Sequence, residues 1–333
     1  MITLKRKSKK ILSWLSGEEE PQAKTIPSLS LFDKAITLLS KLSYISIRIF
    51  LRIVIGKEKR EKLGFYRARI NFSVTYSFYL FMYFYKTVRL LRLGNPTLIK
   101  LYVPKYDYKI YCPPTLNDFE NMTAREAEIL EHFCPQKGDT VIDVGAHLGR
   151  YALIGANRVG VHGKVVAIEA HPLVFEKLKK NIELNNFTNV MCLNYAVHSQ
   201  ENIKLKLFVP NKGLENNLYN TIVADRSKKR FLKENFIEVN ANTLDNIIDS
   251  AGITPENVKW IKIDVEGAEL EVLKGAHNIL TKSKDLALLI EIHNISDGRN
   301  LYDDIMDLVK AYNFKLEFEK ILDIGEGHII IKK

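Results

Sequence analysis

Two acidic residues and two glycines form the group most suggestive of ligand binding in this 333-residue chain. In the segment VIDVGAHLGR, Asp143 stands two positions before Gly145, and Gly149 follows four positions later. Glycines allow a tight turn, and a helix beginning after Gly149 would offer free N–H groups to an anion. Glu169 lies twenty residues beyond Gly149, where an acid ending a second strand can accept both ribose hydroxyls. The turn lacks the G-x-G-x-x-G pattern of dinucleotide folds, so its acidity favours a cationic nucleoside without phosphates over NAD.

A second group of polar side chains follows two later apolar segments. In IKIDVEGAEL, Asp264 follows the apolar run and Glu266 opens the next helix. The segment LLIEIH ends with Glu291 and His293, which share a face because they are two residues apart. A carboxylate or an imidazole can take a proton from a reacting group, so His293, Asp264 and Glu266 are the catalytic candidates. The alternatives are a structural histidine and acids that only interact with a helix dipole.

Metal binding is a further alternative for the second group. Asp264 and Glu266 could supply two carboxylate ligands to a divalent cation. No convincing third ligand is evident in the sequence, so we assign no metal-ligating residues and leave metal dependence open.

The elements that must position both groups alternate between strands and helices. Apolar runs predict strands at 139–144, 164–169, 190–196, 258–263 and 285–292. Helices are expected from Thr123 to about Phe133, after Gly149, and from Pro172 to about Asn185, where a capping box, a glycine turn and an N-terminal proline mark their starts. This alternation predicts an α/β, Rossmann-like doubly wound sheet with helices on both faces and ligands at the carboxyl ends of the strands.

Five segments of the chain together resemble those of a known family, the FkbM-type class I S-adenosylmethionine-dependent methyltransferases. They are VIDVGAHLGRYAL, VVAIEAHP followed by FEKLKKNIELNN, TLDNII at Thr243, WIKIDVEGAELEVLKGA, and LLIEIH. The resemblance covers about residues 100–333 and leaves the first hundred outside. Family members more often carry Asn where His147 stands, which argues against a direct cofactor role for His147.

The resemblance implies a methyltransferase domain at 99–333 that uses S-adenosyl-L-methionine. It places the methionine part of this cofactor beside Asp143, Gly145 and Gly149, and the ribose beside Glu169. It places the adenine beside Tyr195 and Ala196, although Tyr195 also fits a packing role. Asp264 falls where this fold holds the reacting centre.

The region 1–98 differs from the rest of the chain in charge. Residues 1–100 hold 20 Lys and Arg against 6 Asp and Glu, a net charge of +14, whereas the remaining 233 residues hold 29 against 33, a net charge of −4. An anionic partner would therefore meet the N-terminal region.

Two apolar segments of this region suggest attachment to a membrane surface. A helix expected at 29–55 has its cations in one narrow stripe, which consists of Lys34, Lys41, Arg48 and Arg52. Residues 70–85 carry no charge but number only 16, fewer than the roughly 20 that a spanning helix needs. Peripheral binding to anionic lipid fits this pattern. Packing of both segments on the catalytic domain fits it too.

The leading function is O-methylation of a sugar, glycan or glycolipid acceptor. An RNA methyltransferase is a rival, but RNA binding needs positive charge near the cleft, and the catalytic part is mildly acidic. Nucleic acid is therefore not expected as a partner. A non-catalytic membrane scaffold is the second rival, against which the intact acid–glycine turn argues. Three widely separated cysteines indicate a reducing compartment, so we expect a cytoplasmic protein that is peripheral on the membrane.

Overall fold

The computed structural model describes residues 99–103, 105–112, 126–209, 221–223, 236–293, 301–321 and 326–333. The region 1–98, with the helix expected at 29–55 and the uncharged stretch at 70–85, lies outside the described residues, as does the start of the helix expected from Thr123. Two short strands, β1 (Ile99–Val103) and β2 (Tyr108–Cys112), come first in the described part. No helix among the described residues is long and apolar enough to span a membrane.

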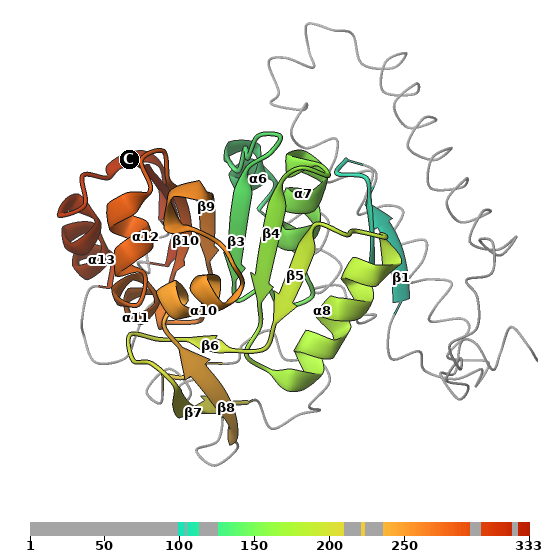
Figure 1. The fold of residues 1–333 in the computed structure, drawn as a ribbon, viewed down its shortest axis with the longest axis horizontal. Helices are drawn as coiled ribbons and strands as arrows, with labels where there is room; N and C mark the ends of the chain where they lie inside the picture. The colour runs from blue at the N-terminus through green and yellow to red at the C-terminus, as the bar shows by residue number, and fades with distance from the viewer. Residues whose placement is uncertain are drawn as a thin grey trace, which may run out of the picture. The chain divides into compact units, whose positions relative to one another are not determined.

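A seven-stranded sheet forms the centre of the remaining structure, with the order β11-β12-β10-β9-β3-β4-β5 (Figure 1). Its strands are β3 (Thr140–Val144), β4 (Lys164–Ile168), β5 (Val190–Leu193), β9 (Val258–Ile263), β10 (Ala287–Ile292), β11 (Lys315–Ile321) and β12 (Gly327–Lys332). Strands β3, β4, β5, β9 and β10 are parallel, while β12 runs antiparallel to both of its neighbours. The doubly wound parallel sheet predicted from the sequence is thus confirmed.

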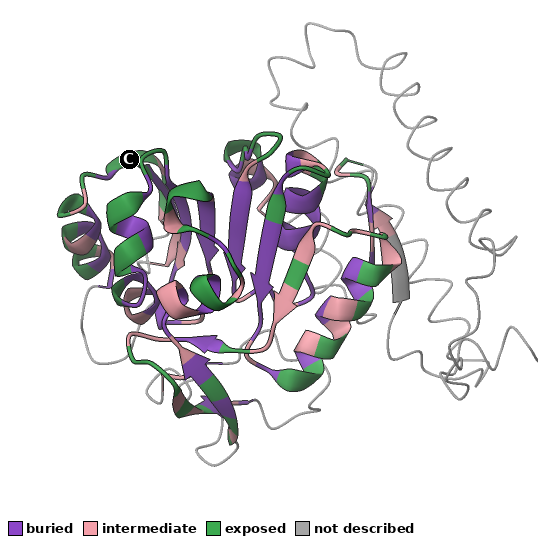
Figure 2. Ribbon diagram, viewed as in Figure 1, coloured by how far each residue is buried: buried purple, intermediate pink, exposed green. Residues whose placement is uncertain are grey.

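Helices pack on both faces of this sheet because its central strands carry apolar side chains on both faces. In β3 the adjacent residues Val141 and Ile142 are both fully buried and face opposite sides. The described helices are α6 (Ala127–His132), α7 (Arg150–Val159), α8 (Pro172–Leu184), α10 (Leu244–Ser250), α11 (Glu269–Lys274), α12 (His277–Lys282), α13 (Leu301–Lys310) and the short 3₁₀ helix Pro255–Asn257. Figure 2 shows most of the length of the central strands as buried, with exposed residues on the outer sides of the helices.

The third expected strand is shorter than predicted. Strand β5 ends at Leu193, and Ala196 instead begins β6 (Ala196–Val197), part of a separate sheet with β7 (Ile203–Phe208) and β8 (Phe236–Asn242). The chain leaves the large sheet at Asn194, whose side-chain amide donates hydrogen bonds to the carbonyls of Glu169 and Ala170. The apolar run therefore covers two strands and the bend between them.

Candidate functional site

The glycine turn after β3 has a backbone that only glycine accommodates. Gly145 has a φ of +76°, and a Cβ atom added there would lie 1.8 Å from the backbone oxygen of Asp264. Gly149 has a φ of +95°, and its added Cβ would meet Leu178 at 2.7 Å. Left-handed φ values are costly for other residues. The turn thus lies against Asp264, just after β9, at Gly145 and against Leu178 of α8 at Gly149.

Two backbone N–H groups, one from this turn and one from the segment after β4, hold the carboxylate of Glu169. The N–H of His147 donates to one carboxylate oxygen at 2.9 Å, and the N–H of His171 donates to the other at 2.8 Å. His147 thus contacts Glu169 through its backbone. Burial raises the pKa of Glu169 to about 7, although these two hydrogen bonds act in the opposite direction. The acid expected to bind ribose is therefore fixed in position before any ligand arrives.

A buried lysine links the first group of acids to the second. Lys262 in β9 is paired in register with Asp143 in β3, and its Nζ lies 3.6 Å from Asp143 Oδ1 and 3.1 Å from Asp264 Oδ2. The Nζ also donates to the carbonyl of Gly145 at 3.2 Å. Asp143 is only 1% exposed, so it is not a solvated acid at a strand end, and Lys262 offsets its charge.

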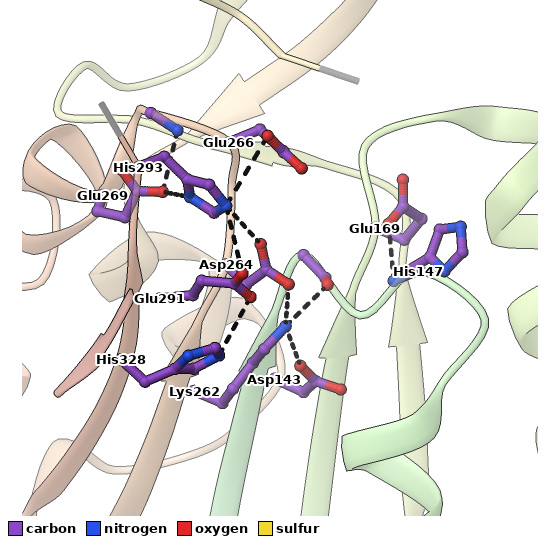
Figure 3. A network of polar contacts seen from close by, with 12 residues as sticks. Asp143, His147, Glu169, Lys262, Asp264, Glu266, Glu269, Glu291, His293 and His328 are labelled. Atoms are coloured by element: carbon purple, nitrogen blue, oxygen red, sulfur yellow. Dashed lines mark hydrogen bonds and ion pairs between the residues drawn. The ribbon is translucent and has the colours of Figure 1, made fainter. Parts of the chain in front are cut away.

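The three catalytic candidates come together beyond the ends of β9 and β10 (Figure 3). Nε2 of His293 lies 3.9 Å from Asp264 Oδ1 and 3.8 Å from Glu266 Oε2. Glu266 has a φ of +56°, an uncommon conformation for a residue with a side chain, and it lies just before α11. The prediction that Asp264 and His293 share the strand-end rim is confirmed by these distances.

Glu269 at the start of α11 orients the imidazole of His293. One oxygen of this fully buried carboxylate lies 2.8 Å from Nδ1 of His293 and accepts the N–H of Gly267 at 2.9 Å. Glu291 approaches the other ring nitrogen of His293 at 3.6 Å, and its second oxygen lies 3.4 Å from His328 in β12. Four carboxylates thus surround one imidazole.

These contacts shift the titration of the group. Burial would lower the pKa of His293, but Glu269 raises it well above the ordinary value. Burial raises the pKa of Asp264 to about 7, opposed by Lys262. Burial would also raise the pKa of Glu291, yet His293 and His328 hold it well below its usual range. Lys262 has a pKa raised by Asp264 and Asp143 in spite of its burial.

Sequence reasoning identified the acids and His293 but missed Lys262, Glu269 and His328. Lys262 had a signal, because a lysine between two isoleucines of a buried strand requires a partner. Glu269 and His328 had none, since their contacts depend on how α11 and β12 pack. The adenine residues stay a prediction, with Tyr195 exposed and Ala196 buried in β6.

The sheet order with one reversed strand, and polar groups gathered at the carboxyl ends of β3, β4, β9 and β10, define a class: the Rossmann-like methyltransferases. Residues 143–316 match the model of the methyltransferase FkbM domain. The chain belongs to this family. It carries the S-adenosylmethionine-dependent methyltransferase domain that its motifs predicted.

Two curated proteins and one solved structure are similar to parts of the chain. Methyltransferase sdnD of Sordaria araneosa is 28% identical over 156 residues, which span 40% of this chain and 59% of that protein. Hexuronic acid methyltransferase AglP of Haloferax volcanii is 26% identical over 186 residues, 56% of this chain and 67% of AglP. A methyltransferase FkbM structure from Methylobacillus flagellatus is 17% identical, with a TM-score of 0.39, over 59% of this chain and 44% of that one. The chain thus spans about three fifths to two thirds of these two curated relatives.

Proposed function

We propose that the protein transfers the methyl group of S-adenosylmethionine to a hydroxyl oxygen of a sugar or glycan. The observation that carries this proposal is the pairing of two groups by Lys262, which contacts both Asp143 beside the glycine turn and Asp264 in the acidic group. The group at Asp143 and the glycine turn fits the cofactor, and the acidic group at Asp264 fits the acceptor. Both lie at the carboxyl ends of neighbouring strands, where doubly wound sheets bind ligands.

In this proposal the cofactor lies along the turn after β3. Asp143, Gly145 and Gly149 surround its methionine part. Glu169 accepts hydrogen bonds from the ribose hydroxyls, and Tyr195 and Ala196 flank the adenine. The fixed carboxylate of Glu169 supports this placement, because both of its oxygens are held by backbone N–H groups and retain lone pairs for the ribose.

The transfer itself needs alignment and loss of a proton. An electron pair of the acceptor oxygen attacks the methyl carbon, the carbon–sulfur bond breaks, and its electron pair stays on sulfur to give S-adenosylhomocysteine. Holding the two reactants in line can lower the barrier by several kcal/mol, up to about 7–11. The hydroxyl proton passes to the group formed by Asp264, Glu266 and His293, which we assign to catalysis.

A sugar acceptor is supported by the similarity to a hexuronic acid methyltransferase. The acidic group supports a hydroxyl as the reacting group, because carboxylates beside His293 can accept the proton that the hydroxyl loses. The excess of positive charge in residues 1–100 further supports an acceptor at an anionic membrane, such as a glycolipid, with the protein bound peripherally.

Calorimetry and a transfer assay test the function. We expect the full chain to bind S-adenosylmethionine and to move a labelled methyl group to oligosaccharide or glycolipid fractions rather than to RNA. A chain that binds NADH but not S-adenosylmethionine would contradict the cofactor assignment. Methylation of RNA alone would show that the acceptor is RNA rather than a sugar or glycan.

Vesicle sedimentation tests the membrane part separately. The full chain should sediment with anionic vesicles and less with neutral ones. Replacement of Lys34, Lys41, Arg48 and Arg52 by Gln should weaken this binding, as should added salt. Binding that resists high salt and alkaline carbonate would indicate a spanning protein, and no binding would remove the support for a glycolipid acceptor.

A further inference from the structure

We propose that Asp264, Glu266 and His293 form a binding site for a divalent metal cation of the Mn²⁺ type. One atom of each side chain lies within 4.8 Å of the corresponding atoms of the other two. The sequence left this site undecided for want of a third ligand. The structure supplies His293, which comes from the end of β10 rather than from the segment that holds the two acids.

The distances within this group suit ligands around an ion better than direct hydrogen bonds. Nε2 of His293 is 3.9 Å from Asp264 Oδ1 and 3.8 Å from Glu266 Oε2, and N–H···O hydrogen bonds measure about 2.7–3.2 Å. Two atoms that each lie about 2.1 Å from one metal ion are separated by about 3.0–4.2 Å, depending on the angle between them. Both observed separations fall within that interval.

His293 is oriented as a metal ligand is. Its side chain is only 6% exposed, and its Nδ1 lies 2.8 Å from the fully buried carboxylate of Glu269. A ligating histidine usually donates its second ring nitrogen to a carboxylate, which fixes the tautomer and the direction of the ring. With Nδ1 donating to Glu269, Nε2 faces Asp264 and Glu266, as Figure 3 shows, and a bound cation would take the place of the proton on Nε2.

The carboxylates around Nε2 of His293 use one oxygen for a contact outside the site and turn the other toward the ring, as Asp264 and Glu291 do. Oδ2 of Asp264 accepts a hydrogen bond from Nζ of Lys262 at 3.1 Å, and Oδ1 of Asp264 faces His293. Glu291 gives one oxygen to His328 at 3.4 Å and turns the other toward Nε2 of His293 at 3.6 Å. Glu291 therefore lies beside the three proposed ligands as a further carboxylate near Nε2 of His293.

The balance of charge favours a cation of more than one charge. Four carboxylates contact His293, while Lys262 contacts Asp264 and His328 contacts Glu291. Buried carboxylates require compensation. Carboxylate oxygens suit Mg²⁺, Ca²⁺ and Mn²⁺, whereas imidazole suits later transition metals. A set of two carboxylates and one imidazole therefore fits Mn²⁺ better than Mg²⁺.

The role of the ion rests on the proposed function, whereas its binding does not. An acceptor hydroxyl coordinated to the ion would lose its proton more readily. The proton would pass to the carboxylate oxygen of Glu266 that does not bind the ion, and the oxygen electron pair would then attack the methyl carbon as described above.

Electron paramagnetic resonance with Mn²⁺ alone tests the site on the full chain after treatment with a chelator. We expect uptake of one Mn²⁺ per chain and an electron spin echo signature of a coordinated nitrogen. Glu266→Gln and His293→Gln should each weaken Mn²⁺ binding by tenfold or more, and His293→Gln should abolish the nitrogen signature. Glu269→Gln should weaken binding by about 10–100-fold through misorientation of the ring.

Glu271→Gln is the matched control, because Glu271 lies in the same helix α11 but contacts Ser199 and Lys274 instead. It should leave Mn²⁺ binding unchanged. No uptake of Mn²⁺, Mg²⁺ or Zn²⁺ by the wild type would overturn the site in favour of a protonated His293 paired with carboxylates. Uptake that Glu266→Gln and His293→Gln do not change would overturn it as adventitious.

Calorimetry with S-adenosylmethionine on the same samples separates the two proposals and shows that each variant is folded. A wild type that binds the cofactor but no metal would contradict the metal site without contradicting the proposed function. A wild type that binds Mn²⁺ but not S-adenosylmethionine would do the reverse.

Discussion

The two halves of the site are fixed in place by different means. On the β3–β4 side, a glycine turn and two backbone N–H groups hold Glu169. On the β9–β10 side, side-chain charges hold one another, with His293 between Glu269, Asp264 and Glu266. Backbone contacts depend little on which side chains are present, whereas charge contacts fail when one partner is removed. The acceptor half should therefore be more sensitive to conservative changes than the cofactor half.

Removal of the lysine that joins the two halves should have the largest effect. Lys262→Met leaves Asp143 and Asp264 without their cation, and loss of one partner of a buried pair costs about 3–5 kcal/mol. Urea denaturation would measure this loss. Lys259→Met is the matched control in the same strand, since Lys259 pairs with an exposed Asp285, and it should cost less than about 1 kcal/mol. Equal losses in both variants would show that Lys262 does not join the halves.

Gly145→Ala should break the cofactor half through the backbone. The added Cβ would collide with the carbonyl of Asp264, at a φ that alanine avoids. We expect a loss of about 3 kcal/mol in stability or a comparable loss of S-adenosylmethionine affinity. Gly252→Ala, which has a similar φ but open space around it, should cost only about 1–2 kcal/mol in stability and leave affinity unchanged. Thermal unfolding and calorimetry would show whether the collision or the φ dominates.

Conservative changes in the acceptor half should lower turnover more than cofactor affinity. Asp264→Asn and His293→Gln are each expected to reduce kcat by about 10²-fold or more, while the dissociation constant of S-adenosylmethionine changes by less than about threefold. Asp285→Asn, at an exposed acid, serves as control. A larger effect on the dissociation constant than on kcat would assign these residues to the cofactor instead.

The smallest expected effect is the pH dependence of S-adenosylmethionine binding that Glu169 causes. Its pKa, raised by burial to about 7 in the cofactor-free chain, means that the ionised form, which accepts ribose hydrogen bonds, dominates only above that pH. Binding of S-adenosylmethionine should then weaken about tenfold per pH unit below 7, and Glu169→Gln should remove this dependence. Stability of the cofactor-free chain should change with the opposite sign, falling as pH rises from about 4.5 to 7, because the folded state binds the proton more tightly there. Affinity that is flat from pH 6 to 8 would contradict the assignment.

The sheet was predictable from the sequence because its parallel strands are buried on both faces and are mainly apolar, as at residues 165–168 of β4. The acids at the strand ends were predictable for the same reason. The bend at Asn194 was not, since its amide satisfies carbonyls distant in sequence. Glu269 and His328 were missed because nothing local marks a residue whose partner comes from another element.

The register that pairs Asp143 with Lys262 also bears on how such chains diverge. A change at either position alone would leave a buried charge without its partner. The first substitution is therefore destabilising until a second one restores the balance of charge. Relatives should therefore carry Asp143, Lys262 and Asp264 either intact as a set or replaced together by a set of lower charge. Transplanting a β9 segment from a family member with a different set should succeed only when its β3 segment is transplanted with it.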